Sequence, residues 1–206
     1  MARDRSPIVK QSRRERYALH PKAHKVLAKK TGIPGQHSRG NQGKPSLYLT
    51  QLREKQKVRR TYGLLERQFA RLMNEATRDK TGLAGENLLR LLELRIDNTV
   101  YRAGFAPSRQ SARQLVSHGH FVLNGRRVDI PSIRLKPGDE ITVRPRSHKS
   151  GYFSEIDEIV KNSTQGSLSW LKADPKKMVI NITGLPSRTE AEPDINEQLI
   201  VEYYSR

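Results

Sequence analysis

Residues 108–132 constrain the fold of this chain more than any other stretch. Ser108 is a favourable N-cap residue, and the apolar residues over 109–117 recur at spacings of three and four, as on one face of a helix. Gly119 can end that helix. Asn124-Gly125 lies between two short runs of strand-forming residues and is the strongest short signal for a two-residue hairpin. The stretch therefore predicts a helix that packs against short antiparallel strands.

Two segments on the N-terminal side predict further helices. In residues 46–77 the apolar positions form the stripe of an amphipathic helix, which follows a strongly basic helical face over 51–60. Another helix is expected from Gly85 to Gly104. In residues 140–143 polar and apolar residues alternate, which is typical of a strand. Each of the remaining apolar segments in the C-terminal part could form either a short strand or a helix. We therefore predict an α+β fold, with two helices on a short antiparallel sheet beside a helical region.

The chain is long enough for two small units, since single cores usually belong to units of about 100 to 150 residues. We expect a basic N-terminal arm over 1–45, a helical domain over 46–92 and 190–206, and an inserted α/β domain over 93–189. Glycine and proline recur too often in the arm for regular structure, so we expect it to be extended. Residues 195–204 are expected to pack back on the helical region.

Positive charge is concentrated in the first part of the chain. The formal net charge is +18, and residues 1–60 carry 17 lysines and arginines against 3 acidic residues. Residues 61–149 carry 16 against 9, and residues 150–206 carry 6 against 9. Nucleic acid is the expected partner, because neutralised phosphates release condensed counterions. A merely solubilising tail is an alternative. An anionic membrane is a weaker one, since the basic segment lacks a broad apolar face.

Several kinds of chemistry find no support in the sequence. The chain has no cysteine, which excludes disulfides, thiolate zinc sites and cysteine nucleophiles. His20 and His24 lie four apart, but Pro21 and the missing partner ligands favour coincidence over a shared metal. The GxxxxGK(S/T) loop, the GxSxG elbow and the HExxH motif are absent. We therefore expect no metal, no cofactor, no small-molecule substrate and no catalysed reaction.

The sequence also predicts that the protein works away from membranes. No apolar run approaches the roughly 20 residues that cross a bilayer. The first residues lack the apolar core of a secretory signal. We therefore expect an intracellular protein without a membrane partner.

Longer motif runs resemble a known family. Residues 52–69 read LREKQKVRRTYGLLERQF, residues 82–132 begin GLAGENLLRLLELRIDN and end VLNGRRVDIPS, and residues 136–143 read KPGDEITV. In order and wording these runs resemble the bacterial-type small-subunit ribosomal protein four, and the helix and hairpin resemble the RNA-binding module named after it. Many members of that family carry a zinc-binding cysteine cluster near the N-terminus. This chain has none, so the resemblance implies no zinc.

The resemblance implies a function and partners. It implies binding to 16S ribosomal RNA at a five-way junction of the 5′ domain, early in assembly of the small subunit, through shape and phosphate contacts. It further implies a contact with ribosomal protein five of that subunit, a bearing on decoding accuracy, and basic residues beside the path along which mRNA enters. The implied location is a ribosome in the cytoplasm, with an organellar ribosome left open.

Two rival functions share the same module. One is an RNA-modifying enzyme of the pseudouridine-synthase type, which would need a separate catalytic domain. Fewer than about sixty residues follow the module, which is small for a domain. The other is a free RNA chaperone, which the long matching helical region argues against.

Arg109 and Arg113 are the first candidates for RNA contact. They lie four apart on one helix face, so both guanidiniums can straddle a phosphate ridge, and we expect both to be exposed. A solvated face without RNA is the alternative. His118 and His120 either meet RNA or fix the end of the helix, and Asn124 is first of all a turn residue.

The other candidates are cations spread along the chain. In the helical region they point in more than one direction, so only some can face a single RNA ridge. Tyr17 and Tyr48 are available to stack on bases. The expected RNA-contact residues are Arg13, Arg14, Lys22, Lys25 and His37 in the arm, Arg53, Lys55, Lys57, Arg59 and Arg60 in the helical region, and Arg109, Gln110, Arg113, His118, His120, Asn124, Arg126 and Arg127 in the α/β region.

Overall fold

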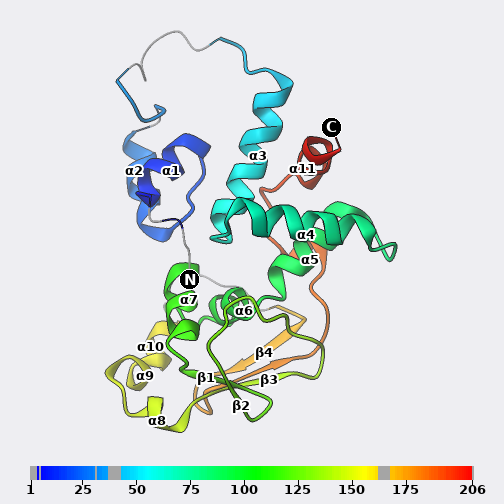
Figure 1. Ribbon diagram of the computed structural model, residues 1–206. Coiled ribbons are helices and arrows are strands. Elements are labelled where there is room, and N and C mark those ends of the chain that lie inside the picture. The colour runs from blue at the N-terminus through cyan, green and yellow to red at the C-terminus, as the bar shows by residue number, and fades with distance from the viewer. Residues whose placement is uncertain (1–3, 5, 31, 37–42, 162–167, 206) are drawn as a thin grey trace. The chain divides into compact units, whose positions relative to one another are not determined.

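The fold was obtained as a computed structural model, which describes residues 4, 6–30, 32–36, 43–161 and 168–205 (Figure 1). The chain divides into two compact units. The first comprises residues 1–88 and 194–206, and the second comprises residues 89–193. Within the described ranges no helix combines the length and the apolar character needed to cross a membrane.

The N-terminal segment of the first unit contains short helices. They are α1 (Ile8–Glu15), the 3₁₀ turn η1 (Pro21–Ala23) and α2 (His24–Lys29). The expectation that this segment lacks regular structure is therefore wrong for these elements. The reason is local, because residues 8–29 contain no glycine and the proline at the start of η1 takes the position where its fixed φ suits a helix.

The helical region that follows forms two helices, α3 (Leu47–Thr61) and α4 (Glu66–Arg78). Gly63 separates them with a φ of 64°. The amide of Leu64 donates to the carbonyl of Arg59 at 2.9 Å, which is the long hydrogen bond of a glycine-terminated helix. The predicted apolar stripe of α4 is buried, and this burial stabilises the unit.

The C-terminal segment returns to this unit. It forms α11 (Glu197–Tyr204), which packs against α3 and confirms the expectation for residues 195–204. Gly85 does not precede a helix but lies in the first turn of α5 (Ala84–Glu93). A Cβ at Gly85 would come within 2.6 Å of Cγ of Glu197, so glycine is required by the close approach of α11.

In the second unit the helix expected to reach Gly104 is interrupted. Leu94 lies in a turn and Arg95 is extended, and α6 (Ile96–Arg102) then begins. The amide of Ile96 donates to the carbonyl of Ile133 at 2.9 Å. A backbone partner distant in sequence therefore replaces the hydrogen bond that would have continued the helix.

The predicted helix, turn and hairpin are confirmed. α7 (Arg109–Ser117) begins at Ser108, whose hydroxyl accepts a hydrogen bond from the amide of Ser111 at 3.2 Å. Asn124 and Gly125 have φ values of 48° and 81°. Positive φ at both central residues defines the type I′ turn that matches the twist of two antiparallel strands.

A five-stranded antiparallel sheet forms the base of this unit, in the order β2-β1-β3-β5-β4 (Figure 1). Its last two strands come from the part of the chain where sequence left strand and helix open. The strands are β1 (Phe121–Leu123), β2 (Arg126–Val128), β3 (Glu140–Val143), β4 (Leu171–Asp174) and β5 (Val179–Ile182).

The core of the second unit lies between this sheet and its helices. Short elements complete the unit: α8 (Pro145–His148), α9 (Gly151–Ser154), α10 (Ile156–Lys161) and the 3₁₀ turn η2 (Arg188–Glu190). The largest side chains in the core are Phe105, Phe121, Phe153 and Trp170, all at most 1% exposed. The α+β fold class predicted from the sequence is confirmed.

Candidate nucleic-acid interface

The two arginines of α7 are bound by acidic side chains of their own unit. Arg109 donates from Nη2 to Glu192 Oε1 at 2.5 Å and from Nε to Asn98 Oδ1 at 2.8 Å. Arg113 pairs with Asp97 at 3.5 Å. Each arginine side chain is only 15% exposed. The prediction that both project freely from an exposed helix face is therefore wrong.

These contacts belong to a larger ion-pair network. Two further arginines take part, Arg95 with Asp97 at 2.8 Å and Arg102 with Glu93 at 2.7 Å. Arg102 also lies 3.5 Å from Glu192. Buried ion pairs are tolerated only when further hydrogen bonds satisfy the charges, and Asn98 supplies such bonds. The network therefore ties α6, α7 and the segment around residue 192 together.

The end of α7 places one histidine at the surface and one partly inside. His118 is exposed, whereas His120 Nδ1 lies 3.0 Å from the hydroxyl of Ser147. Burial lowers the pKa of His120, and the neighbouring His118 and Arg144 lower it further. The contacts of His120 therefore support a structural role, in which it stabilises the turn after α7. His118 remains accessible to solvent.

Gly119 makes room for an arginine of the hairpin. Its φ is 70°, and a Cβ there would lie 2.6 Å from Nε of Arg127. The guanidinium of Arg127 therefore rests on the glycine between the two histidines. Arg126 and Arg127 are both exposed, as expected. Asn124 stabilises the turn, because its side-chain amide donates to Asp139 and its side-chain oxygen accepts from the amide of Glu140.

In the first unit the cations of α3 are largely engaged. Lys55 is buried and donates to Glu66 at 2.8 Å. Lys57 donates to the carbonyl of Asp194, and Arg59 donates to Gln56. Side-chain exposure of the five cations predicted on α3 is 39% for Arg53, 4% for Lys55, 14% for Lys57, 13% for Arg59 and 16% for Arg60. Of these five cations, Arg53 has the most exposed side chain, although it also pairs with Glu15.

Glu15 is the acidic residue that joins α1 to α3. Its side chain is fully buried, accepts from Arg53 at 3.3 Å and forms a second ion pair with Arg60. Burial raises the pKa of Glu15, although the two guanidiniums act in the opposite direction. The basic N-terminal segment is therefore attached to α3 through a carboxylate.

The N-terminal segment exposes most of its predicted cations. Arg14, Lys22 and Lys25 are exposed, and Arg13 is half-buried because its guanidinium donates to the carbonyl of Gly32. His37 lies outside the described residues. In this segment, positive charge is thus available for a polyanion.

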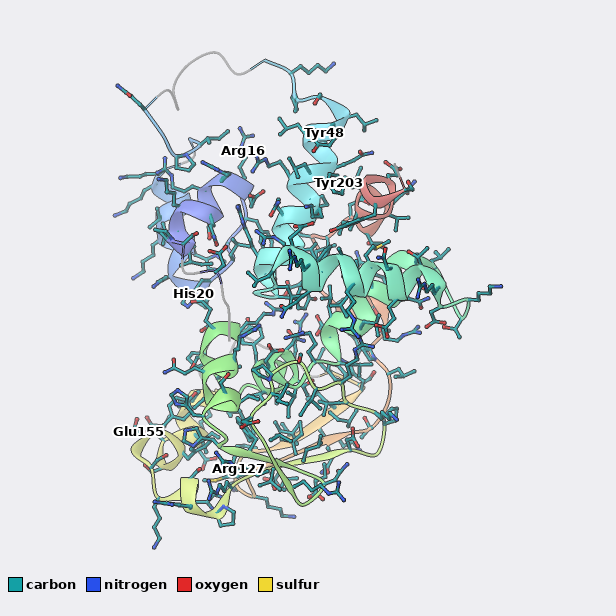
Figure 2. The ribbon with its side chains drawn as sticks, viewed as in Figure 1. Arg16, His20, Tyr48, Arg127, Glu155 and Tyr203 are labelled. Atoms are coloured by element: carbon teal, nitrogen blue, oxygen red, sulfur yellow. The ribbon has the colours of Figure 1, made fainter. Side chains whose placement is uncertain are left out.

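Both tyrosines proposed for stacking have intramolecular neighbours. The ring of Tyr48 lies 5.8 Å from that of Tyr203 (Figure 2), and the ammonium of Lys57 lies 5.5 Å from the ring of Tyr17. Tyr48 is 49% exposed, so part of its surface is still accessible.

Nδ1 of His20 accepts from the amide of Lys22, and the described residues contain no group of three His, Cys, Asp or Glu placed to hold a metal.

Sequence reasoning missed several exposed cations. Arg67, Arg71 and Arg78 lie on the outer face of α4, and Arg146 and Lys149 lie on or after α8. The three on α4 were recognisable, because they alternate with the apolar stripe of the same helix at helical spacing. Gln110, which sequence reasoning did single out, is exposed on α7.

Comparison with known families places the chain among S4-domain proteins. The S4 domain model matches residues 94–141, which contain α6, α7, β1, β2 and the first two residues of β3. The model described as ribosomal protein S4/S9 N-terminal domain matches residues 3–93. The chain belongs to the small ribosomal subunit protein uS4 family, which is a family of ribosomal structural proteins and not of enzymes.

Similarity to individual relatives extends over the whole chain. It is 46% identical over 206 residues to small ribosomal subunit protein uS4 of Chlorobium phaeovibrioides. It is 45% identical over 207 residues to that of Roseiflexus sp. and over 212 residues to that of Syntrophomonas wolfei. All of this chain and all of each relative are covered.

Proposed function

We propose that this protein is a structural component of the small ribosomal subunit that binds 16S rRNA. The observation that carries the proposal is the full-length similarity to uS4 proteins. The positive charge that remains exposed supports it, because RNA helices are recognised mostly through their phosphates and shape. Binding early in assembly would help to nucleate the body of the subunit.

The mode of binding follows from which cations are free to act. We assign direct RNA contact to Arg14, Lys22 and Lys25 in the N-terminal segment and to Arg126 and Arg127 in the hairpin, since these are exposed. Arg53, Gln110 and His118 are proposed as further contacts. The predicted residues that bind other side chains or backbone groups contribute by stabilising the fold, among them Lys55, Lys57, Arg59, Arg60, His120 and Asn124. Arg109 and Arg113, bound by Glu192 and Asp97, then act chiefly through the fold.

Further parts of the proposal rest on the resemblance alone. We include the junction of the 5′ domain as the binding site, a contact with ribosomal protein five and a position beside the path of mRNA. An influence on decoding accuracy would follow from that position. The proposed domains are an arm over 1–45, a helical domain over 46–92 and 190–206, and an RNA-binding domain over 93–189. We also propose a cytoplasmic ribosome, since the relatives named above come from bacteria.

Sedimentation tests the proposal. The tagged protein should migrate with the small ribosomal subunit after a moderate salt wash, and the purified protein should bind a 16S rRNA 5′-domain transcript in filter assays. Affinity should fall steeply with salt concentration, because phosphate contacts release counterions. Migration at the top of the gradient, or equal affinity for the transcript and an unrelated RNA, would reject the proposal.

A further inference from the structure

The outer face of α4 carries a row of exposed polar residues, the α4 stripe, three of which are arginines. Arg67, Arg71, Asn74 and Arg78 are separated by four, three and four residues and are all exposed. This spacing places them in one line along the helix, because positions three and four apart share a face. The opposite face is apolar and buried in the unit. The helix thus presents three guanidiniums in a row to the solvent.

These arginines differ from the cations of α3 and α7 in lacking acidic partners. Within the described part of the chain, no carboxylate pairs with Arg67, Arg71 or Arg78, whereas those of α3 and α7 are bound by acids of their own unit. Glu66, the acid at the start of α4, is occupied by Lys55 and by the hydroxyl of Tyr204. Among the described residues, the three guanidiniums of the α4 stripe therefore remain without an ion pair to a carboxylate.

The geometry of the stripe suits a phosphate backbone. At about 1.5 Å per residue, Arg67 and Arg78 lie roughly 16 Å apart along the helix axis, which is long enough to meet several phosphates. A guanidinium binds a phosphate through two parallel N–H donors, and the amide of Asn74 adds a neutral donor between the charges. Since α4 is a regular helix packed on the unit, the row is held straight.

We propose that Arg67, Arg71 and Arg78 form a phosphate-binding ridge through which this protein holds ribosomal RNA. The ridge rests on the proposed function and adds a binding element to it, separate from the N-terminal segment and from the hairpin. RNA is the favoured polyanion, because a straight row of guanidiniums matches evenly spaced phosphates better than the irregular carboxylates of a protein surface.

A charge-matched pair of variants tests the ridge. Arg67→Gln/Arg71→Gln/Arg78→Gln should reduce the slope of log affinity against log salt for the 16S rRNA 5′-domain transcript by about 2 to 3, since each phosphate contact contributes roughly 0.7 to 0.9. The control Lys172→Gln/Lys176→Gln/Lys177→Gln removes the same charge from exposed lysines and should leave the slope unchanged. Thermal unfolding should give equal midpoints for both variants and wild type.

The outcomes separate the ridge from the proposed function. If wild-type protein binds the transcript and the α4 variant keeps its slope, the ridge is wrong and the proposed function stands. Equal losses in both triple variants would indicate diffuse net charge and overturn the ridge as well. Loss of subunit association at unchanged rRNA affinity would assign α4 to an acidic protein. The single variant Arg71→Lys, which keeps the charge, should weaken binding while retaining the slope.

Discussion

Glu190 shows how a single residue can link the stability of this fold to pH. Its carboxylate accepts from the amide of Ser169 at 2.6 Å and from the hydroxyl of Ser187 at 2.8 Å. Burial alone would raise the pKa of Glu190, but these hydrogen bonds outweigh it and hold the pKa at about 2, against an ordinary value of 4.5. The charged form is therefore favoured in the folded state.

The expected consequence is a loss of stability in acid. A carboxyl group whose pKa is depressed by folding stabilises the protein fully above its unfolded pKa, and this contribution disappears as pH falls from about 4.5 towards about 2. Glu190→Gln should lower the free energy of unfolding at neutral pH and flatten its dependence on pH in that window. Urea unfolding over a pH series measures this. Exposed Glu158→Gln is the control, and identical curves for Glu190→Gln and wild type would contradict the prediction.

At the scale of elements, the ion-pair network determines what α7 does. Arg109 lies at the start of the helix and is bound by Glu192 and Asn98, so that α6, α7 and the segment before α11 are connected by hydrogen-bonded charges. Removing one member leaves its partners buried without compensation. The network is therefore expected to contribute to stability first and to RNA affinity second.

We predict that Arg109→Ala destabilises the protein by at least roughly 1–3 kcal/mol, the cost of leaving a buried hydrogen-bonding group without its partner. Chemical unfolding measures the change. Gln110→Ala, at an exposed neighbouring position of α7, should have little effect on stability. An unchanged unfolding midpoint together with weakened rRNA binding would mean that Arg109 contacts RNA directly and that the ion pairs are dispensable.

At the scale of the whole molecule, the formal net charge overstates the positive charge that is available to bind RNA. The net charge is +18, but many cations of α3, α6 and α7 are paired with acids inside their own unit. The exposed cations to which we assign RNA contact lie on the N-terminal segment, the hairpin and α4. The salt dependence of RNA binding should follow these exposed cations, because only charges that meet phosphates release counterions.

Replacing two exposed lysines of the N-terminal segment tests this at the level of the molecule. Lys22→Gln/Lys25→Gln should reduce the salt slope of 16S rRNA binding by about 1 to 2 and leave the unfolding midpoint unchanged. Lys57→Gln should instead lower the midpoint, because Lys57 binds Glu54 and the carbonyl of Asp194. If the slope responds to Lys57 and not to Lys22 and Lys25, the distinction between paired and exposed cations is wrong.

Local signals predicted the helix over 109–117, its cap and the hairpin, because each depends on contacts between residues close in sequence. The expected extended arm was wrong where helices form over 8–29. The break at residues 94–95 was missed as well, since it arises from pairing with residues near 133. The two C-terminal strands are individually short and ambiguous. Their pairing is set by tertiary structure, since β5 pairs with β3 and β4 pairs with β5.

The sequence by itself determined the fold class, the excess of positive charge and the family resemblance, since composition, periodicity and long motif runs are properties of the chain. Only the tertiary structure decided which cations are available. Glu192 lies 83 residues from Arg109, and Glu15 lies 45 residues from Arg60. No local pattern reveals such partners, because ion pairs form between side chains that folding brings within a few ångströms of each other.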